Sequence, residues 1–547
     1  MKQLAWSLVF IVGVQSASAQ EHHAAGPPKP AVLLAGMGQH HHPISTTNAE
    51  AQRFFDQGLT LVFGFNHDEA VRSFERAAEL DPQSPMPWWG VALALGPNIN
   101  MPMDEAQHKR AYGALEKALA LAAKAPENER AYVEALAKRY SSDPKANLMT
   151  LQVAYANAMG ELVKHYPDDL DAATLYAESL MDLNPWRLWT SDGKPAAGTE
   201  EIVAMLESVL RRDPNHVGAN HYYIHAVEAS PHPEKALASA KRLETLVTGA
   251  GHLVHMPGHI YMRTGDYGGV ITANERAAEA DRQYMRATGT EGSMYDLMYY
   301  SHNVHFLAHG FMAEGKFAEA RKAADELVAH VAPAVPQFAV AEFFLPTANF
   351  VLLRFQRWDD VLRAPAPDSQ WTTTTGLWHF ARGVAHAATG NVSAAERERQ
   401  ELAAIESKTP PEAEFSAYFN KARTFLALAG ASLDARIAAA QGHRKDAIER
   451  WKKAVEISDS LNYGEPPEWY YPVRESLGGE LLRDGQNAEA EKVFRDDLER
   501  NPRNPRSLFG LMESLNAQKK SVAAELVRRQ FEAAWKNADV KLRVEDL

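Results

Sequence analysis

From about Asn48 onward the chain follows one pattern, and this pattern limits the folds that it can adopt. Ala, Leu, Glu and Arg recur at helical spacing, and breaks containing Gly, Asn, Asp or Pro interrupt them every twelve to twenty residues. No stretch shows the apolar and polar alternation of a half-buried strand. The sequence therefore predicts an all-α protein. Its 547 residues exceed what one compact core usually accommodates, which favours several domains or an extended array.

The breaks themselves repeat as units of two helices. In FFDQGLTLVFGFNHDEAVRSFERAAELDP the first helix carries large, small and large residues, the second carries small, large and small ones, and a proline closes the unit: Phe54, Gly58, Leu61, Ala70, Phe74, Ala77 and Pro82. Small residues let two antiparallel helices approach, and large ones fill the gap to the next pair. This unit resembles a tetratricopeptide repeat (TPR), and similar units recur along almost all of the chain after residue 47. The resemblance implies a right-handed superhelical α-solenoid of about eight to ten TPR-like helix pairs with loop insertions.

Other segments set the organisation of the chain. Residues 1–19 have a basic start, an apolar run from Leu4 to Val14 and a small-residue site ending at Ala19, which is typical of a cleaved signal peptide. We therefore expect an exported, bacterial-type member of the TPR family, periplasmic or secreted. Residues 20–47 are interpreted as a flexible His- and Pro-rich arm, 48–363 as an N-terminal array, 364–376 as a linker and 377–547 as a C-terminal array. Insertions near residues 96–108, 182–200 and 281–300 are expected on one face of the solenoid, which is often the binding face.

Composition excludes several classes of function. The chain has no cysteine, so it cannot form disulfides, thiolate metal sites or iron–sulfur clusters, and any metal must be held by nitrogen and oxygen. The formal charge of −13 and the lack of a basic stripe argue against nucleic acid as a partner. No segment after the signal peptide approaches the roughly twenty apolar residues of a membrane span.

Eight histidines occupy matching places in three consecutive units. Positions are counted back from the residue expected to open the second helix of each unit, which is Ala236, Val270 or Ala320. One histidine lies eleven residues before this point in every unit, another lies fifteen before it in every unit, and a third lies eighteen before it in two units. The set is His221, His225, His252, His255, His259, His302, His305 and His309. The first two units repeat at 34 residues, the period of the TPR family.

This spacing predicts that the imidazoles converge. Residues three, four and seven positions apart share one helix face, about 5–6 Å apart, and packed helices lie about 8–10 Å apart. We therefore expect all eight side chains to point into a common volume, and the resemblance implies that this volume is the concave groove and not the space between helices. Pro257 kinks or starts a helix inside HLVHMPGH, so His252 is the least secure member of the set.

Three interpretations of the cluster remain open: a metal centre, a polar groove for an acidic peptide or small molecule, and a purely structural cluster. Imidazoles packed without a partner leave unsatisfied nitrogens, and protonating them places like charges side by side. A metal ion resolves both problems, which favours the first interpretation. Neutral imidazole suits Cu and Zn best, with Fe and Ni as alternatives, whereas Ca and Mg prefer oxygen. Paired His-x-x-x-His segments also resemble binuclear type 3 copper sites, at the level of spacing only.

Two functions follow from these interpretations. The first is an exported TPR solenoid that binds a transition metal through its histidine cluster, either as a metalloenzyme (a hydrolase or an oxidoreductase) or as a metal-handling protein. The second is a non-catalytic TPR scaffold that binds a peptide or protein partner in its groove, with the histidines as groove lining.

Several further residues are candidates near the cluster. Glu178 stands eleven residues after Pro167, as His225 does after Pro214, and is expected one helix along on the same face as a ligand, an acid/base or a partner that orients an imidazole. Asp182 stands one turn later on the same helix, and Glu228, near the end of its helix, is a weaker candidate ligand. Two tryptophans of the following insertion, Trp186 and Trp189, either cover the site or anchor the loop. The arm histidines either take part in metal capture or are solvated: His22, His23, His40, His41 and His42.

Overall fold

The computed structural model describes residues 29–416 and 420–547, and within these ranges the secondary structure is helical apart from isolated β-bridges. This confirms the prediction of an all-α protein. The expected signal peptide, the first part of the arm and His22 and His23 lie outside the described residues.

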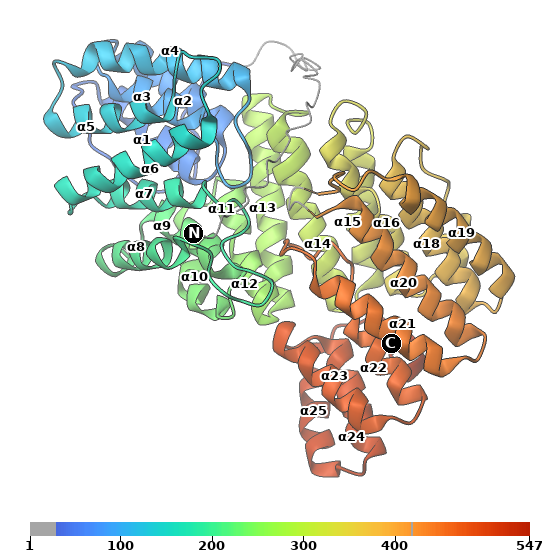
Figure 1. Ribbon diagram of the computed structural model, residues 1–547. Coiled ribbons are helices and arrows are strands. Elements are labelled where there is room, and N and C mark those ends of the chain that lie inside the picture. The colour runs from blue at the N-terminus through green and yellow to red at the C-terminus, as the bar shows by residue number, and fades with distance from the viewer. Residues whose placement is uncertain (1–28, 417–419) are drawn as a thin grey trace, which may run out of the picture.

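The helices succeed one another along the chain as neighbours (Figure 1). The N-terminal series is α1 (Ala49–Phe63), α2 (His67–Leu80), α3 (Met86–Ala94), α4 (Glu105–Ala122), α5 (Glu127–Leu136), α6 (Leu148–His165), α7 (Leu170–Met181), α8 (Thr199–Arg212), α9 (Val217–Glu228), α10 (Leu237–Leu246), α11 (Gly251–His255), α12 (Pro257–Thr264), α13 (Tyr267–Thr288), α14 (Ser301–Ala313), α15 (Phe317–Val331), α16 (Thr347–Arg354) and α17 (Trp358–Arg363). The C-terminal series is α18 (Thr372–Ala388), α19 (Val392–Lys408), α20 (Ala422–Ala440), α21 (Arg444–Asp459), α22 (Arg474–Arg483), α23 (Asn487–Arg500), α24 (Pro505–Ala517) and α25 (Ser521–Ala534).

The small and large residues of the repeated unit pack as the sequence pattern predicts. The ring of Phe74 on α2 lies against Gly58 of α1 and Gly90 of α3, where an added Cβ would approach the ring to 2.7 and 2.5 Å. Phe494 on α23 repeats this contact between the glycines of α22 and α24. Glycine is required at these positions because a larger residue would push the helices apart. The same packing therefore occurs in the first and in the last helix pairs of the described chain.

The two arrays meet again after the linker. Residues 364–371 form the coil between α17 and α18, so the expected linker 364–376 is shorter than predicted, because Thr372 already begins α18. The helices that follow it turn back beside the N-terminal part of the chain (Figure 1). The backbone of Asp539 donates to the carbonyl of Gly315 at 3.1 Å, and the side chain of Asp539 accepts from the amide of Phe317. At the turn after α12, the carbonyl of Pro502 lies so close to Gly265 that it leaves no room for a Cβ, and the φ of 74° at Gly265 also favours glycine. The C-terminal array thus contacts the region that carries the histidines.

The described part of the arm, residues 29–47, packs against the N-terminal array. Gln57 of α1 accepts from the amide of Leu34 at 2.7 Å and donates to the carbonyl of Val32 at 2.9 Å. The carbonyl of Gly36 accepts from the amide of Gly249. These partners satisfy the backbone of an extended segment. The segment that was expected to be flexible is therefore held on the surface over this part of its length.

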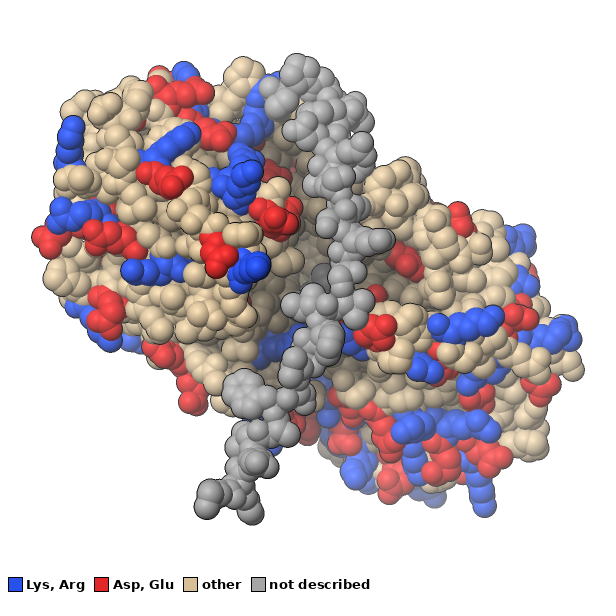
Figure 2. Space-filling view, turned by 45° about the horizontal axis from the view of Figure 1, so that its top comes forward, with Lys and Arg blue, Asp and Glu red and all other residues tan. Residues whose placement is uncertain are grey.

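The surface carries charges of both signs. On the face in Figure 2, Lys and Arg side chains alternate with Asp and Glu over both arrays, unlike the basic stripe that binding of nucleic acid phosphates needs. Among the helices of the two described ranges, none is both long enough and apolar enough to cross a membrane.

Candidate metal centre

Six of the eight histidines form two groups of three in the structure. The first triad is His221, His225 and His252, and the second triad is His255, His259 and His302; within each, the ligand nitrogens lie within 4.8 Å of one another. The first triad combines an i, i+4 pair from α9 with one residue of α11. The second combines a pair spread over α11 and α12 with one residue of α14. Each triad therefore takes two ligands from one unit and the third from the next.

Pro257 breaks the helix without separating the second triad. α11 ends at His255, and α12 begins at Pro257, which needs no hydrogen-bonded N–H at this position. The Nε2 atoms of His255 and His259 still lie 2.7 Å apart across the break. His252, the residue that the proline made least secure, lies in the first triad beside the α9 pair.

Hydrogen bonds fix two rings of the first triad with Nε2 facing inward. Nδ1 of His221 donates to the carbonyl of Phe63, and Nδ1 of His225 donates to Oε1 of Glu228 at 2.7 Å. Nε2 of both rings and both nitrogens of His252 are buried without a hydrogen-bond partner. An unpartnered buried polar group costs about 1–3 kcal/mol. Two inward nitrogens on anchored rings, together with one nitrogen of His252, are the arrangement expected of a three-imidazole metal ligand set.

The second triad is anchored in the same way. Nδ1 of His255 donates to Oδ1 of Asn274 at 2.6 Å, and Asn274 is itself held by its bond to the carbonyl of Val270. Nδ1 of His259 donates to Oε2 of Glu228. The two Nε2 atoms consequently face each other. Glu228 spans the two triads, because one of its oxygens binds His225 and the other binds His259.

Burial keeps most of these imidazoles neutral. Burial lowers the pKa of His221, His252, His255 and His302 well below the ordinary value, and neighbouring imidazoles lower it further. Burial opposes charge on His259 as well, but the charge and hydrogen bond of Glu228 outweigh it and raise the pKa of His259. A protonated His259 donates from Nε2 to His255, and a metal ion would replace this proton. Neutral imidazole is the form that binds metal.

Glu228 is ionised despite its burial. Burial alone would raise the pKa of its carboxyl, but the charges and hydrogen bonds of His259 and His225 hold this pKa at about 2. From the sequence, Glu228 is a weaker candidate ligand than Glu178. The signal that could have raised its rank was its position three residues after His225, on the same face of α9.

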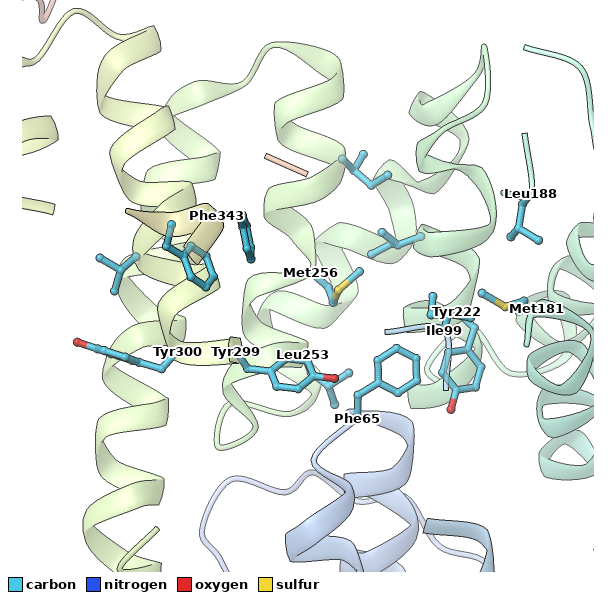
Figure 3. Close-up of a cluster of buried hydrophobic side chains, with 14 of the residues drawn as sticks. Phe65, Ile99, Met181, Leu188, Tyr222, Leu253, Met256, Tyr299, Tyr300 and Phe343 are labelled. Carbon is cyan, nitrogen blue, oxygen red and sulfur yellow. The ribbon is translucent and has the colours of Figure 1, made fainter. Parts of the chain in front are cut away.

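Aromatic rings enclose both triads. Phe65 packs against the first triad, with ring centroids 4.6 Å from His221 and 5.6 Å from His252. Phe306 packs against the second, 4.7 Å from His255 and 5.1 Å from His259. Figure 3 shows Phe65 reaching from the turn after α1 into the apolar shell. Phe65 has a φ of 55°, which is uncommon for a large side chain and indicates that the surrounding packing holds it there.

The triads are buried and do not line an open groove, which corrects the placement implied by the TPR resemblance. The exposed fractions of His221, His255 and His259 are 0%, 0% and 1%. Two of the insertions account for the difference. Trp186 from the loop after α7 contacts His225 at 5.7 Å, and Tyr299 from the π-helical turn Asp296–Tyr300 contacts His252 at 4.9 Å. The insertions fill the groove where the histidines stand.

His305 and His309 lie apart from the triads, so the expected convergence of all eight side chains does not occur. Their rings contact each other at 4.8 Å, and His305 packs against Phe344 at 5.4 Å. The physical reason is the next unit, which presents the phenylalanine pair Phe343 and Phe344 here, where the earlier units present a histidine. Burial lowers the pKa of His309 to about 3, with a further contribution from Arg354.

Glu178 and Asp182 lie in neither triad. Both are buried beside Arg139, whose guanidinium donates to the carboxylate of Asp182. Burial and the neighbouring Asp182 raise the pKa of Glu178 well above its ordinary value.

The two tryptophans of the insertion after α7 have different roles. Trp189 donates from its indole nitrogen to the carbonyl of Ala226 at 2.8 Å and anchors the insertion, whereas Trp186 covers the first triad.

The arm histidines His40 and His42 belong to a separate cluster around Asp171. The carboxylate of Asp171 lies 3.0 Å from Nε2 of His40, 2.7 Å from Nδ1 of His42 and 3.2 Å from Nε2 of His216. Nδ1 of His216 accepts from the amide of Ala219, so its proton is on the nitrogen that faces Asp171. The group is close enough to hold a metal, but this proton occupies the ligand position. The geometry favours a carboxylate satisfied by imidazole donors. His41 bonds Asp56 at the surface.

Replacing Asp171 with Asn should loosen the arm in a pH-dependent way. Burial alone would raise the pKa of Asp171, but His40, His216 and His42 hold it well below its ordinary value, and Asp171 raises the pKa values of His40 and His42 above 6.5. Their stabilisation is present below pH 6.5 and is lost as the pH rises through the raised values. The variant should lose about 1–3 kcal/mol of stability near pH 6. Thermal unfolding at pH 6 and pH 9 measures it.

The control for this variant is Asp168→Asn, because Asp168 pairs with Arg212 and its side chain is 98% exposed. It should unfold like the parent at both pH values. If Asp171→Asn lost the same amount of stability at both pH values, His40 and His42 would carry no charge in the folded arm.

Comparisons with known proteins give little beyond the helical architecture. No protein-family model and no curated protein sequence matches the chain. Three solved structures are similar to it. Human IFIT1, solved as a dimer with m7Gppp-AAAA, is 14% identical, with 91% of this chain and 92% of that chain covered and a TM-score of 0.33. Yeast Tom70 is 12% identical (88% and 90% covered, TM-score 0.30), and Cut9–Hcn1 of the APC/C is 12% identical (92% and 95% covered, TM-score 0.29). Values this low carry no information about what this chain binds.

Proposed function

We propose that this protein binds transition-metal ions at the two histidine triads inside its N-terminal array. The observation that carries the proposal is the set of inward-facing nitrogens of the first triad. Nε2 of His221 and His225 and both nitrogens of His252 are buried and have no hydrogen-bond partner, while the outer nitrogens of His221 and His225 are anchored. A metal ion takes one nitrogen from each ring, so one ion would satisfy Nε2 of His221, Nε2 of His225 and one nitrogen of His252 at once.

Copper or zinc fits this ligand set best. The triads offer imidazole nitrogens as ligands, and the carboxylate of Glu228 bonds the outer nitrogens of His225 and His259, which opposes calcium, magnesium and manganese. Three imidazoles leave at least one coordination position open on each ion, and an open position suits either catalysis or transfer of the ion. We propose that the protein works outside the cytoplasm, because residues 1–19 have the pattern of a signal peptide.

Burial weighs against the scaffold function that used the histidines as groove lining. A peptide in the groove would need side chains that it can reach, whereas five of the six triad residues are buried. The scaffold function would have to use other surfaces of the solenoid and would leave the orphaned nitrogens without an explanation.

Metal analysis of the full chain, purified without an affinity tag, tests the proposal. We expect stoichiometric copper or zinc and a clear fall of the melting temperature after treatment with a chelator. His255→Ala should remove metal from the second triad and leave the helical circular dichroism intact. His443→Ala serves as the control, because His443 lies outside the groups of potential ligands among the described residues. Metal-free protein whose stability does not respond to added copper or zinc would overturn the proposal.

A further inference from the structure

We propose that the two triads form one centre, in which a pair of copper ions shares a single dioxygen molecule. This inference rests on the proposed function, because it requires that both triads hold copper. It adds the pairing of the ions, their oxidation state and the ligand that lies between them.

The triads are in direct contact. The rings of His225 and His259 lie 5.5 Å apart, and those of His252 and His255 lie 5.7 Å apart in a stacked arrangement. Two residues of the first triad therefore each touch a residue of the second. Ions held inside triads that are this close can share a ligand, as paired ions do in two-metal sites at about 3.5–4 Å.

Glu228 ties the two triads to each other. Its Oε1 accepts from Nδ1 of His225 at 2.7 Å, and its Oε2 accepts from Nδ1 of His259. A single carboxylate therefore sets the orientation of one ligand in each triad, and the two Nε2 atoms are directed relative to one rigid group. Two independent sites would not need a shared anchor.

The charge of the site favours copper(I) and an anionic bridge. Six neutral imidazoles compensate none of the metal charge, the carboxylate of Glu228 compensates one unit of it, and buried positive charge is costly. Two copper(I) ions bring a charge of +2. When dioxygen binds, each copper(I) gives up one electron, the dioxygen gains both and becomes peroxide, and the O–O bond falls from double to single. Two copper(II) ions and one peroxide again sum to +2, so the buried charge is unchanged and no proton is needed. Release of dioxygen returns the electrons.

The space beside the centre admits only small molecules. A cavity of about 20 Å³ touches His225 and Glu228 and is otherwise lined mainly by apolar groups such as Ile99, Trp186 and Leu188. A water molecule needs about 10–15 Å³ of such space, so the cavity accepts a diatomic molecule and excludes a phenol or a peptide. Its apolar walls suit dioxygen, which carries no charge.

The test uses the full, tag-free chain loaded without oxygen with two equivalents of copper(I). After addition of dioxygen we expect uptake of one molecule per two copper ions and almost no copper(II) electron paramagnetic resonance signal, because two copper(II) ions bridged by peroxide couple their spins. Removal of the gas should restore copper(I). Failure to retain either copper or zinc would overturn the proposed function. Two bound copper ions that give the full copper(II) signal, or retention of zinc in place of copper, would overturn only the shared centre.

Single ligand variants sharpen the result. His252→Ala removes one ligand of the first triad, and His302→Ala removes one of the second. Each variant should retain one copper ion and show its full copper(II) signal after exposure to air. The matched control is His379→Ala on α18, whose ring bonds Glu398 at 2.7 Å away from the triads. This control should bind two copper ions and show almost no copper(II) electron paramagnetic resonance signal. A silent signal in both triad variants would contradict the pairing.

Discussion

Replacement of Glu228 by Gln should reduce the bound metal from two ions per chain to one. The amide oxygen of Gln can accept from Nδ1 of one histidine, but its NH₂ group must donate to Nδ1 of the other. That second imidazole must then carry its proton on Nε2 and is lost as a ligand. Either His225 or His259 is removed in this way, because the carboxylate of Glu228 bonds both. For the remaining ion, loss of the charged anchor should weaken binding about 10- to 100-fold.

Metal content and a competition titration with a chelator measure this effect, and circular dichroism checks that the variant folds. The matched control is Glu234→Gln, since Glu234 bonds His232 in an exposed histidine–carboxylate pair at 3.2 Å. It should leave both ions in place. Two tightly held ions in Glu228→Gln would show that the carboxylate does not orient the ligands.

The sequence was sufficient for the type of fold because each helix pair is a local unit. The contact of Phe74 with Gly58 is encoded by residues sixteen positions apart. Helical spacing and small residues specify such pairs without knowledge of distant segments. The repeat frame also identified all six residues of the triads, since residues at equal positions of successive units lie side by side.

The grouping of the histidines was not predictable in the same way. The frame treated the three units as equal and placed eight imidazoles together. In the structure, His252 joins the pair of the preceding unit, and Phe344 ends the series at His305. Such partners depend on how side chains fill the space between units, which a one-dimensional pattern does not contain. For the same reason the spacing from Pro167 placed Glu178 correctly on a helix. It could not show that the guanidinium of Arg139, 39 residues earlier, lies beside Glu178 and Asp182.

Insertions account for the burial of the triads, which was not expected from the sequence. They were expected on the binding face, but their own side chains occupy it. Trp186 and Tyr299 come from two of the insertions and contact the triads, and Phe65 from the turn between α1 and α2 contacts the first triad as well. These contacts join separate units of the array, and no periodicity specifies them. The consequence is chemical: a groove site would be open to water, whereas this site is enclosed.

Replacement of Arg139 by Met should destabilise the N-terminal array strongly. Arg139 is 1% exposed, and its guanidinium binds the carboxylate of Asp182, Oε1 of Gln152 at 3.0 Å and the carbonyl of Pro97 at 3.2 Å. Without it, Asp182 is a buried carboxylate with no cation beside a second carboxyl, that of Glu178. Breaking a buried pair from one side costs about 3–5 kcal/mol. The exposed pair of Arg130 with Glu134 provides the control, and Arg130→Met should cost less than about 1 kcal/mol.

The loss in Arg139→Met should depend on pH in a defined direction. Burial raises the pKa of Asp182 and Arg139 lowers it, with a balance at about 6. Removing the guanidinium raises this pKa further. A carboxyl group whose folded pKa lies above its unfolded value destabilises the fold at high pH, and the penalty shrinks as the pH falls and the group is protonated. The melting temperature of the variant should therefore fall further below that of the parent at pH 8 than at pH 5. Adding Asp182→Asn should recover part of the loss at pH 8, and the metal bound per folded chain should be unchanged because these residues lie in neither triad. An equal loss at both pH values would locate the cost in packing and not in the unpaired carboxylate.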